Sequence, residues 1–354
     1  MITIVVSLSV IALSVYLLSI ITDEFFIVSL DQIAIRLKLP HNVAGASLMA
    51  MGSSAPELAI ALLALFTAGG AHSDLGIATI VGSAVFNILV ITGISAIARP
   101  ANVSWRVIVR DIVMYIIAVA ILLVTISDGV VTIPETILYL ATYVVYLFIL
   151  YQWESFAPGK EEDVVEIIEE ELADEHTRSG IYYRITEAIS RVIGLAMGNA
   201  KRNYVRAFFV SIALISVLSW FLVENAVAFA EAIHISPVIV ALTILAAGTS
   251  VPDAFASLVV ARQGRGEMAI ANAVGSNIFD ILVGLGLPWL LALLFLGDTI
   301  TIGTEGLWTS ALVLLGTVVL LFVFLTTNRK LSRWEGWILI GAYVVYVLWV
   351  WVQG

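Results

Sequence analysis

Ten long apolar runs constrain the fold of this 354-residue chain more than any other feature. A run of about 20 apolar residues can cross the hydrocarbon core of a bilayer as a helix, with its backbone hydrogen bonds made inside the segment. In agreement, 61% of the residues are hydrophobic and 12% are charged. The runs predict an all-α integral membrane protein with ten spans, at residues 2–21, 43–67, 74–98, 108–127, 130–151, 204–224, 238–261, 268–296, 305–326 and 334–352.

The remaining composition excludes several classes of protein. The chain has no cysteine, which excludes disulfides, thiol chemistry and cysteine-based metal sites. No Lys or Arg precedes Arg36, so the first run lacks the basic start of a signal peptide. The net charge of −10 is largely local, because nine of the 27 acidic residues lie between Glu161 and Glu175. No basic patch indicates binding to nucleic acid, so the bilayer is the expected partner, and protein partners stay unknown.

The basic residues predict how the spans are oriented. With the N-terminus placed outside, all 17 Lys and Arg residues fall in the gaps on the inner side of the membrane. Positive residues accumulate in cytoplasmic loops, so both termini are expected outside. The spans then form two five-helix halves, 1–153 and 204–354, joined by an acidic cytoplasmic linker at 154–203. The halves enter the membrane in opposite senses, as in the inverted repeats of alternating-access carriers.

Two pairs of matching motifs support this division. Gly-Ser-Ser-Ala-Pro-Glu at 52–57 corresponds to Gly-Thr-Ser-Val-Pro-Asp at 248–253, and Val-Gly-Ser-Ala-Val-Phe-Asn at 81–87 corresponds to Val-Gly-Ser-Asn-Ile-Phe-Asp at 274–280. Each proline motif predicts a helix break just before a carboxylate, deep in an apolar run. A carboxylate at the centre of a membrane helix costs roughly 3 kcal/mol or more, so it is usually paired, solvated or functional.

The residue types in these motifs suit a hard cation. Glu57, Asp253 and Asp280 supply carboxylates, and Asn87 supplies an amide oxygen. Na⁺, K⁺ and Ca²⁺ prefer such oxygen ligands, and the absence of His and Cys from the motifs argues against zinc, copper and iron. Further oxygens are expected from hydroxyls and from backbone carbonyls that the prolines free, at Ala50, Ser53, Ser54, Ser83, Ala246, Thr249, Ser250 and Ser276.

Charge counting suggests how such a site couples two ions. The three carboxylates carry −3 when all are ionised, and Ca²⁺ cancels two of these charges. Three Na⁺ ions also balance the set. A site that holds either Ca²⁺ or several Na⁺, but not both, couples the two fluxes.

The four motifs resemble the two alpha-repeats of the sodium/calcium exchangers in the cation/calcium antiporter superfamily. The similarity is dense over about 40–98 and 236–290, and the other spans match only in number and position. The resemblance implies that Glu57 and Asp253 are the central Ca²⁺ ligands, shared with Na⁺, and that carbonyls of Ser53 and Thr249 complete the Ca²⁺ site. It implies that flanking Na⁺ sites are lined by Ala50, Ser54, Ser83, Ala246, Ser250 and Ser276. It also implies that Asn87 and Asp280 form a second ligand pair, and that the helices at 2–21 and 204–224 slide against the other helices.

The branch of the superfamily stays open at this point. Gly275–Leu287 resembles the potassium-dependent exchangers, in which an Asp at the position of Asp280 is associated with K⁺. That branch usually has a hydroxyl residue where this chain has Ala256, and the two proline motifs also resemble the potassium-independent branch. Proton/calcium exchangers usually have a Glu at the position of Ser53 or Thr249, which makes that alternative weaker.

Two other classes fit the sequence less well. An intramembrane aspartyl protease needs a Gly-x-Gly-Asp type of motif, and Gly284–Leu287 lacks the acid. A cation channel usually gathers identical loops from several subunits, whereas one chain here carries both halves of a non-identical site. We therefore expect a secondary antiporter of the cell membrane, not an enzyme and without a cofactor, in which Na⁺ entry expels Ca²⁺.

Other polar features receive structural interpretations. The acidic stretch Glu161–Glu175 lacks the ligand pattern of a calcium loop and is interpreted as a solvated linker or an amphipathic helix. Gly82 and Gly275 are interpreted as packing residues. No role is assigned to His41, His72, His176 and His234.

Overall fold

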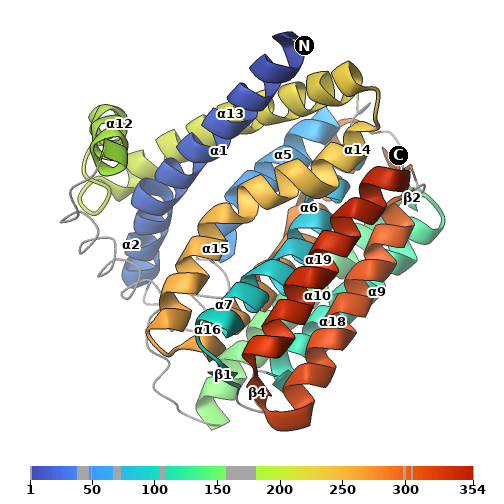
Figure 1. The fold of residues 1–354 in the computed structure, drawn as a ribbon. Coiled ribbons are helices and arrows are strands. Elements are labelled where there is room, and N and C mark those ends of the chain that lie inside the picture. Colours follow the sequence, from blue (N-terminus) through green and yellow to red (C-terminus); the bar gives the residue numbers. More distant parts are fainter. Residues whose placement is uncertain are drawn as a thin grey trace.

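The computed structural model describes residues 2–37, 48, 50–66, 73–103, 108–156, 181–297, 300–303 and 306–353. The acidic stretch at 161–175 and three of the four histidines lie outside these residues. The described chain is almost entirely helical, with four two-residue strands (Figure 1).

The elements of the first half run from residue 2 to residue 156. In chain order the elements are α1 (Ile2–Ile21), the π-helical turn η1 (Thr22–Phe26), α2 (Ile27–Leu37), α4 (Ala50–Ser53), α5 (Ala55–Phe66), α6 (Ser73–Phe86), η4 (Asn87–Ile91), α7 (Thr92–Ala98), β1 (Ala101–Asn102), η5 (Ile108–Ile112), α9 (Val113–Ser127), β2 (Val130–Val131) and α10 (Ile133–Phe156).

The second half follows the amphipathic helix α12 (Ile181–Met197), which belongs to the predicted linker. Its elements are α13 (Tyr204–Ile233), α14 (Pro237–Val240), η6 (Ala241–Leu245), α15 (Ala246–Arg262), α16 (Gly266–Phe279), η7 (Asp280–Leu285), α17 (Gly286–Phe295), β3 (Ile300–Thr301), α18 (Leu307–Asn328), β4 (Lys330–Leu331) and α19 (Arg333–Gln353).

Within the described ranges, nine helices are long and apolar enough to cross a membrane. The remaining predicted span, 43–67, is only partly described, as α4 and the 12-residue α5. The expectation of a multi-pass helical membrane protein is therefore confirmed. Hydropathy decides this outcome, because a chain of apolar helices must satisfy its backbone internally wherever lipid replaces water.

The first predicted span and the span predicted at 204–224 are shorter than the helices observed. Ile2–Leu37 forms one 36-residue helical stretch, and α13 has 30 residues. Asp23 and Glu24 interrupt the hydropathy of the first helix, but an acidic side chain does not end a helix. α13 ends where His234 adopts the left-handed conformation, with φ of 60°, shortly before Pro237 begins the next helix.

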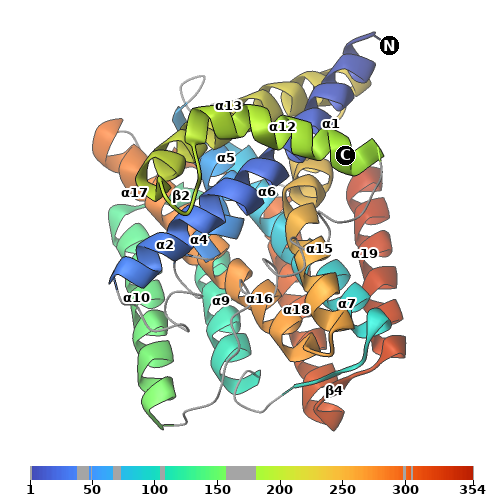
Figure 2. The same cartoon turned by 90° about the vertical axis from the view of Figure 1, so that its left-hand side faces the viewer.

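The helices form a central group that is covered on two sides. α1 and α13 pack along each other and lie across α5 and α15, as Figures 1 and 2 show. α5 packs on α6, α15 packs on α16, and α6 also contacts α15. On the other side, α9 pairs with α18, α10 with α17, and α19 with α7. The motif-bearing helices are therefore surrounded by the rest of the chain.

Burial confirms that α6 lies at the centre. In the most apolar window of the helix Ser73–Ala98, 89% of the residues are buried inside the protein, against 22% in Arg333–Gln353. A helix that is apolar on every side and also buried on every side belongs to the interior. Gly82 allows the closest approach, because a Cβ there would lie 2.3 Å from the carbonyl oxygen of Leu242 in η6. The packing role of Gly82 is thereby confirmed, whereas around Gly275 the described residues place no atom within 4 Å of such a Cβ.

Two small antiparallel strand pairs connect the halves at opposite ends of the bundle. β1 pairs with β4, with Ala101 opposite Leu331, and β2 pairs with β3, with Val130 opposite Thr301. β1 and β3 each follow the second motif of their half, and β2 and β4 each join the last two helices of theirs. Each pair thus joins a strand that follows the second motif of one half to a strand that links the last two helices of the other half. In Figure 1 both chain termini lie toward the end that carries β2, away from β1 and β4.

Candidate functional site

The two proline motifs adopt different backbone conformations. In the first half, α4 ends at Ser53 and α5 begins at Ala55, so the helix is interrupted at Ser54 alone, where backbone bonds from Ser54 N to the Ala50 carbonyl and from Leu58 N to the Ser54 carbonyl, both 3.0 Å, still connect the two helices. In the second half, α15 runs without interruption through Pro252, and the expected break there is wrong. Pro252 removes a single N–H donor, and hydroxyls can compensate for such losses inside a membrane helix. The adjacent π-helical turn η6 absorbs an extra residue just before α15 begins.

The second pair of motifs ends in matching π-helical turns. η4 starts at Asn87 and η7 starts at Asp280, directly after α6 and α16. A π-helical turn inserts one residue into a helix and re-aims the side chains around it, often at functional positions. Both side chains are 1% exposed, so an amide and a carboxylate are held in the interior at equivalent places.

Two pairs of serine hydroxyls connect the two halves of the chain. The hydroxyl oxygens of Ser54 and Ser276 are 3.1 Å apart, and those of Ser83 and Ser250 are 2.7 Å apart. Ser54 and Ser250 occupy the same position in the two proline motifs, and Ser83 and Ser276 the same position in the other two. Each bond is therefore the counterpart of the other, with the halves exchanged.

An amide network that the sequence did not indicate lies beside these hydroxyls. The Asn87 side-chain amide donates to Oδ1 of Asn277 at 2.9 Å. Asn277 in turn donates to the carbonyl of Ala84 at 3.1 Å and to the hydroxyl of Tyr115 at 2.9 Å. Asn277 is fully buried. Its neighbours in the motif received roles, but Asn277 stands where the first half has Ala84, so the repeat gave no signal for it.

Three buried oxygens of the site have no hydrogen-bond partner among the described residues. They are Glu57 Oε2, Asn87 Oδ1 and Asp280 Oδ1. Glu57 is 3% exposed, and its other oxygen accepts a hydrogen bond of 3.4 Å from Ser83. An unpartnered buried acceptor normally costs about 1–3 kcal/mol, and more when it is charged. Acceptors of this kind suit bound cations, which would supply the missing partners.

The carboxylates are spread out and are not gathered in one cluster. Nowhere in the described ranges do three His, Cys, Asp or Glu side chains come close enough to hold one metal ion. Within the same ranges, Lys and Arg form no ion pair with Glu57, Asp253 or Asp280. Any ion held here therefore needs hydroxyl and carbonyl oxygens besides the carboxylates.

The expected carbonyl ligands, Ser53 and Thr249, lie on α4 and α15. The Ser53 hydroxyl donates to the carbonyl of Ala50 at 3.4 Å. Thr249 donates to the carbonyls of Leu245 at 3.1 Å and Ala246 at 3.3 Å. These bonds occupy one lone pair of each carbonyl and fix the two hydroxyls against their own helices. The carbonyls of Ser53 and Thr249 receive no hydrogen bond from a described side chain.

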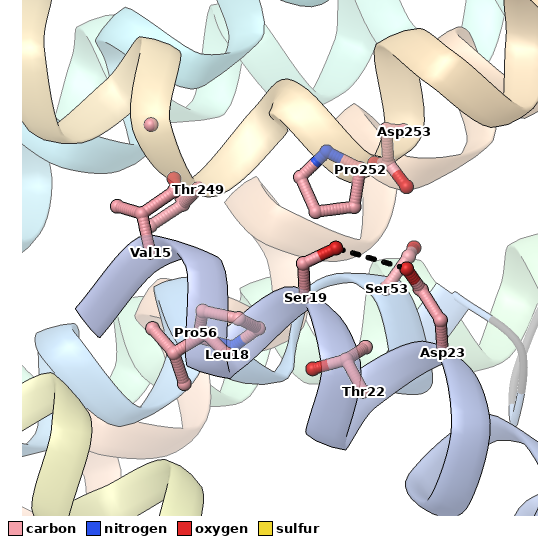
Figure 3. Close-up of a pocket in the computed structure, with 11 residues that line it drawn as sticks. Val15, Leu18, Ser19, Thr22, Asp23, Ser53, Pro56, Thr249, Pro252 and Asp253 are labelled. Carbon is pink, nitrogen blue, oxygen red and sulfur yellow. Dashed lines mark hydrogen bonds between the residues drawn. The ribbon is translucent and has the colours of Figure 1, made fainter. Parts of the chain in front are cut away.

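A narrow cavity lies between α1 and the two proline motifs (Figure 3). Its volume of ≈ 10 Å³ is enough for about one water molecule or one small ion. Asp253 lines it from α15, and Asp23 lines it from the π-helical turn η1. Asp23 received no role from the sequence, because its helix lies outside both pairs of matching motifs. The other lining residues are Val15, Leu18, Ser19, Thr22, Ser53, Pro56, Gly248, Thr249 and Pro252.

Comparison with known proteins adds a family and an architecture. The family described as "Sodium/calcium exchanger protein" matches residues 6–152 and 204–352. The human protein sodium/potassium/calcium exchanger 5 is 30% identical over 401 residues, covering 92% of this chain and 79% of its own length. Human sodium/potassium/calcium exchanger 4 is 26% identical, covering 94% of this chain and 78% of its own length.

A solved structure shares the architecture. The sodium-calcium exchanger NCX_Mj, soaked with Na⁺ and Sr²⁺, superposes with a TM-score of 0.60 and covers 98% of this chain and 99% of its own. The two sequences are 22% identical over the match. At that identity the likeness concerns the arrangement of the helices.

Proposed function

Because the chain belongs to the sodium/calcium exchanger family, we propose that it is a secondary antiporter that exchanges Na⁺ for Ca²⁺ at one shared oxygen site. The family consists of ion exchangers and not of enzymes. The proposed ligands are the carboxylates of Glu57 and Asp253, with the carbonyls of Ser53 and Thr249. The proposed flanking ligands are Asn87, Asp280, Ala50, Ser54, Ser83, Ala246, Ser250 and Ser276.

The observation that carries this proposal is the set of buried unpartnered oxygens. Glu57, Asn87 and Asp280 each keep one such oxygen, and they come from both halves of the chain. A fold that only needed rigid packing would place apolar side chains at these positions, since that avoids the desolvation of a carboxylate. Hard cations would supply the missing partner.

We extend the proposal to the architecture: ten spans in two inverted five-helix repeats, with both termini outside. Two exchanged hydroxyl pairs and two exchanged strand pairs support the repeat. The orientation rests on the basic residues, of which Arg99, Arg262 and Lys330 lie near β1 and β4 at one end of the bundle. The acidic linker at 154–203 would then be cytoplasmic.

The proposed cycle moves α1 and α13 against the remaining helices. These two helices pack on each other and lie across α5 and α15, which carry the proline motifs. Sliding of the pair would expose the site first to one side of the membrane and then to the other. In the cell membrane, Na⁺ moving down its gradient into the cell would expel Ca²⁺.

The relatives favour a second candidate, in which K⁺ is also transported. Both human relatives described above are named sodium/potassium/calcium exchangers. Asp280 would supply the charge for that ion, because its carboxylate is buried and one of its oxygens has no partner among the described residues. The K⁺ requirement separates this candidate from simple Na⁺/Ca²⁺ exchange.

The decisive experiment is uptake of radioactive Ca²⁺ into proteoliposomes loaded with Na⁺ and diluted into Na⁺-free buffer, with and without K⁺. Uptake that requires internal Na⁺ would support the exchanger, and stimulation by K⁺ would favour the second candidate. Absence of Na⁺-driven uptake in both buffers would refute both. Vesicles loaded with choline in place of Na⁺ are the control for passive leak.

A further inference from the structure

We propose that Asp23 is a cation-binding residue of α1, which together with Asp253 holds a Na⁺ or Ca²⁺ ion in the cavity between α1 and the proline motifs. The ion in this position couples occupancy of the site to the placement of α1. The inference rests on the proposed function, which it extends to a ligand outside the four motifs.

A π-helical turn and a hydrogen bond from Ser19 position the side chain of Asp23. Asp23 lies in η1, where the π-helical turn re-aims the side chains of a helix that is otherwise regular. Its carboxylate accepts a hydrogen bond of 3.1 Å from Ser19, one turn earlier, which fixes its direction. Figure 3 shows the carboxylates of Asp23 and Asp253 extending into the same space from helices on opposite sides of it.

A second observation points to a ligand in this cavity. Thr22 is 3% exposed and lines the cavity, and its hydroxyl has no hydrogen-bond partner among the described residues. A threonine buried only for packing normally donates to a carbonyl of its own helix, as Thr79 and Thr243 do here. The lining of the cavity therefore carries one unsatisfied hydroxyl besides the two carboxylates.

The chemistry of the lining selects the ligand class. Two carboxylates and a hydroxyl in a space of ≈ 10 Å³ suit a dehydrated hard cation and exclude anions and larger organic molecules. No Lys, Arg or His lines the cavity. Without an ion, two carboxylates facing one low-dielectric space repel each other and push α1 away from α15. A bound cation reverses that force, so the position of α1 responds to occupancy.

Neighbouring side chains provide matched controls. Glu24 follows Asp23 in the same turn, but it accepts a hydrogen bond from Ser190 of α12 and does not line the cavity. Glu24→Gln therefore removes the same charge from the same turn outside the proposed site. Asp23→Glu keeps the charge, and Ser19→Ala removes only the hydrogen bond that fixes the carboxylate.

The test is equilibrium binding of Ca²⁺ to the purified full-length protein in detergent, with Na⁺ competition. We expect Asp23→Asn to weaken Ca²⁺ binding by about tenfold, the loss of one charged ligand. Asp23→Glu should recover most of that loss, and Glu24→Gln should bind like the wild type. Ser19→Ala and Thr22→Val should each show a smaller loss than Asp23→Asn, because Ser19 only orients the carboxylate and Thr22 offers a neutral oxygen. Thr22→Val preserves shape, so it still tests the site if Asp23→Asn does not fold.

The outcomes separate this inference from the proposed function. Wild-type affinity in both Asp23→Asn and Thr22→Val would overturn the inference and leave the exchanger intact. An equal loss in Asp23→Asn, Asp23→Glu and Ser19→Ala would also overturn it, since it would indicate a packing role. Absence of Ca²⁺ binding to the wild-type protein would refute the exchanger itself, and the role of Asp23 with it.

Discussion

Carboxylates at the centre of this protein have no positively charged partner among the described residues. Glu57 and Asp253 are the clearest case, because within the described ranges neither forms an ion pair. We expect Glu57→Gln and Asp253→Asn each to abolish Na⁺-driven Ca²⁺ uptake, because an amide of the same shape binds Ca²⁺ far more weakly. Glu187→Gln, which removes an exposed acid paired with Arg191, is the control. Near-normal uptake in either site variant would remove the central ligand assignment.

Asp280 should influence the monovalent ions more than Ca²⁺. Asp280 begins η7 as Asn87 begins η4, whereas Asp253 lines the cavity together with Ser53 and Thr249. Asp280→Asn is therefore expected to shift the Na⁺ or K⁺ concentration for half-maximal uptake while the Ca²⁺ affinity changes little. Uptake measured over Na⁺ and K⁺ series decides this, and unchanged dependence on both ions would contradict the assignment.

Asn277 joins the two halves through three hydrogen bonds, and we expect it to stabilise the fold. Asn277→Leu has a similar size but leaves the amide of Asn87 and the hydroxyl of Tyr115 without their present partner. Such losses cost about 1–3 kcal/mol for each buried group, so the unfolding temperature in detergent should fall clearly. Asn225→Leu is the matched control, because among the described residues the amide of Asn225 bonds only to the carbonyl of Phe221 in its own helix. Equal unfolding temperatures in both variants would contradict this role.

Among the packed elements, the contact of α6 with η6 leaves the least room for change. Gly82→Ala would place a Cβ 2.3 Å from a backbone oxygen, which only a shift of one helix relieves. Overpacking of this kind costs about 1–3 kcal/mol. We expect a lower unfolding temperature and slower transport. Gly316→Ala on α18 is the control, because no described atom lies within 4 Å of the added Cβ.

Local sequence signals account for the helices and for the motif residues, and they fail where tertiary contacts decide. Hydropathy finds the spans because lipid imposes the same demand on every one of them. It misses the inner part of the first helix, where Asp23 and Glu24 are tolerated because the cavity and α12 receive them. The proline at 252 predicts a break that the continuous α15 does not show. Asn277 was missed because the first half has Ala84 at its position, and Asp23 was missed because it lies outside both pairs of matching motifs.

The arrangement of the whole chain makes a prediction about its two surfaces. In the inverted repeat that we propose, a two-fold operation relates the halves and reverses the direction of every helix with respect to the membrane; the exchanged hydroxyl and strand pairs are consistent with it. Ser127, next to β2, and Gln263, after α15, are both exposed at helix ends and should face opposite sides. Because the chain has no cysteine, a single cysteine at either position is the only thiol present.

In right-side-out vesicles, a membrane-impermeant thiol reagent should therefore label Ser127→Cys and leave Gln263→Cys unlabelled until the membrane is permeabilised. The basic residues set this direction, since Arg262 and Arg265 flank Gln263 and none lies near Ser127. Inside-out vesicles must give the reverse pattern, which controls for differences in reactivity between the two thiols. Labelling of both variants from the same side would contradict the inverted repeat, and a reversed pattern in both vesicle types would place the termini inside.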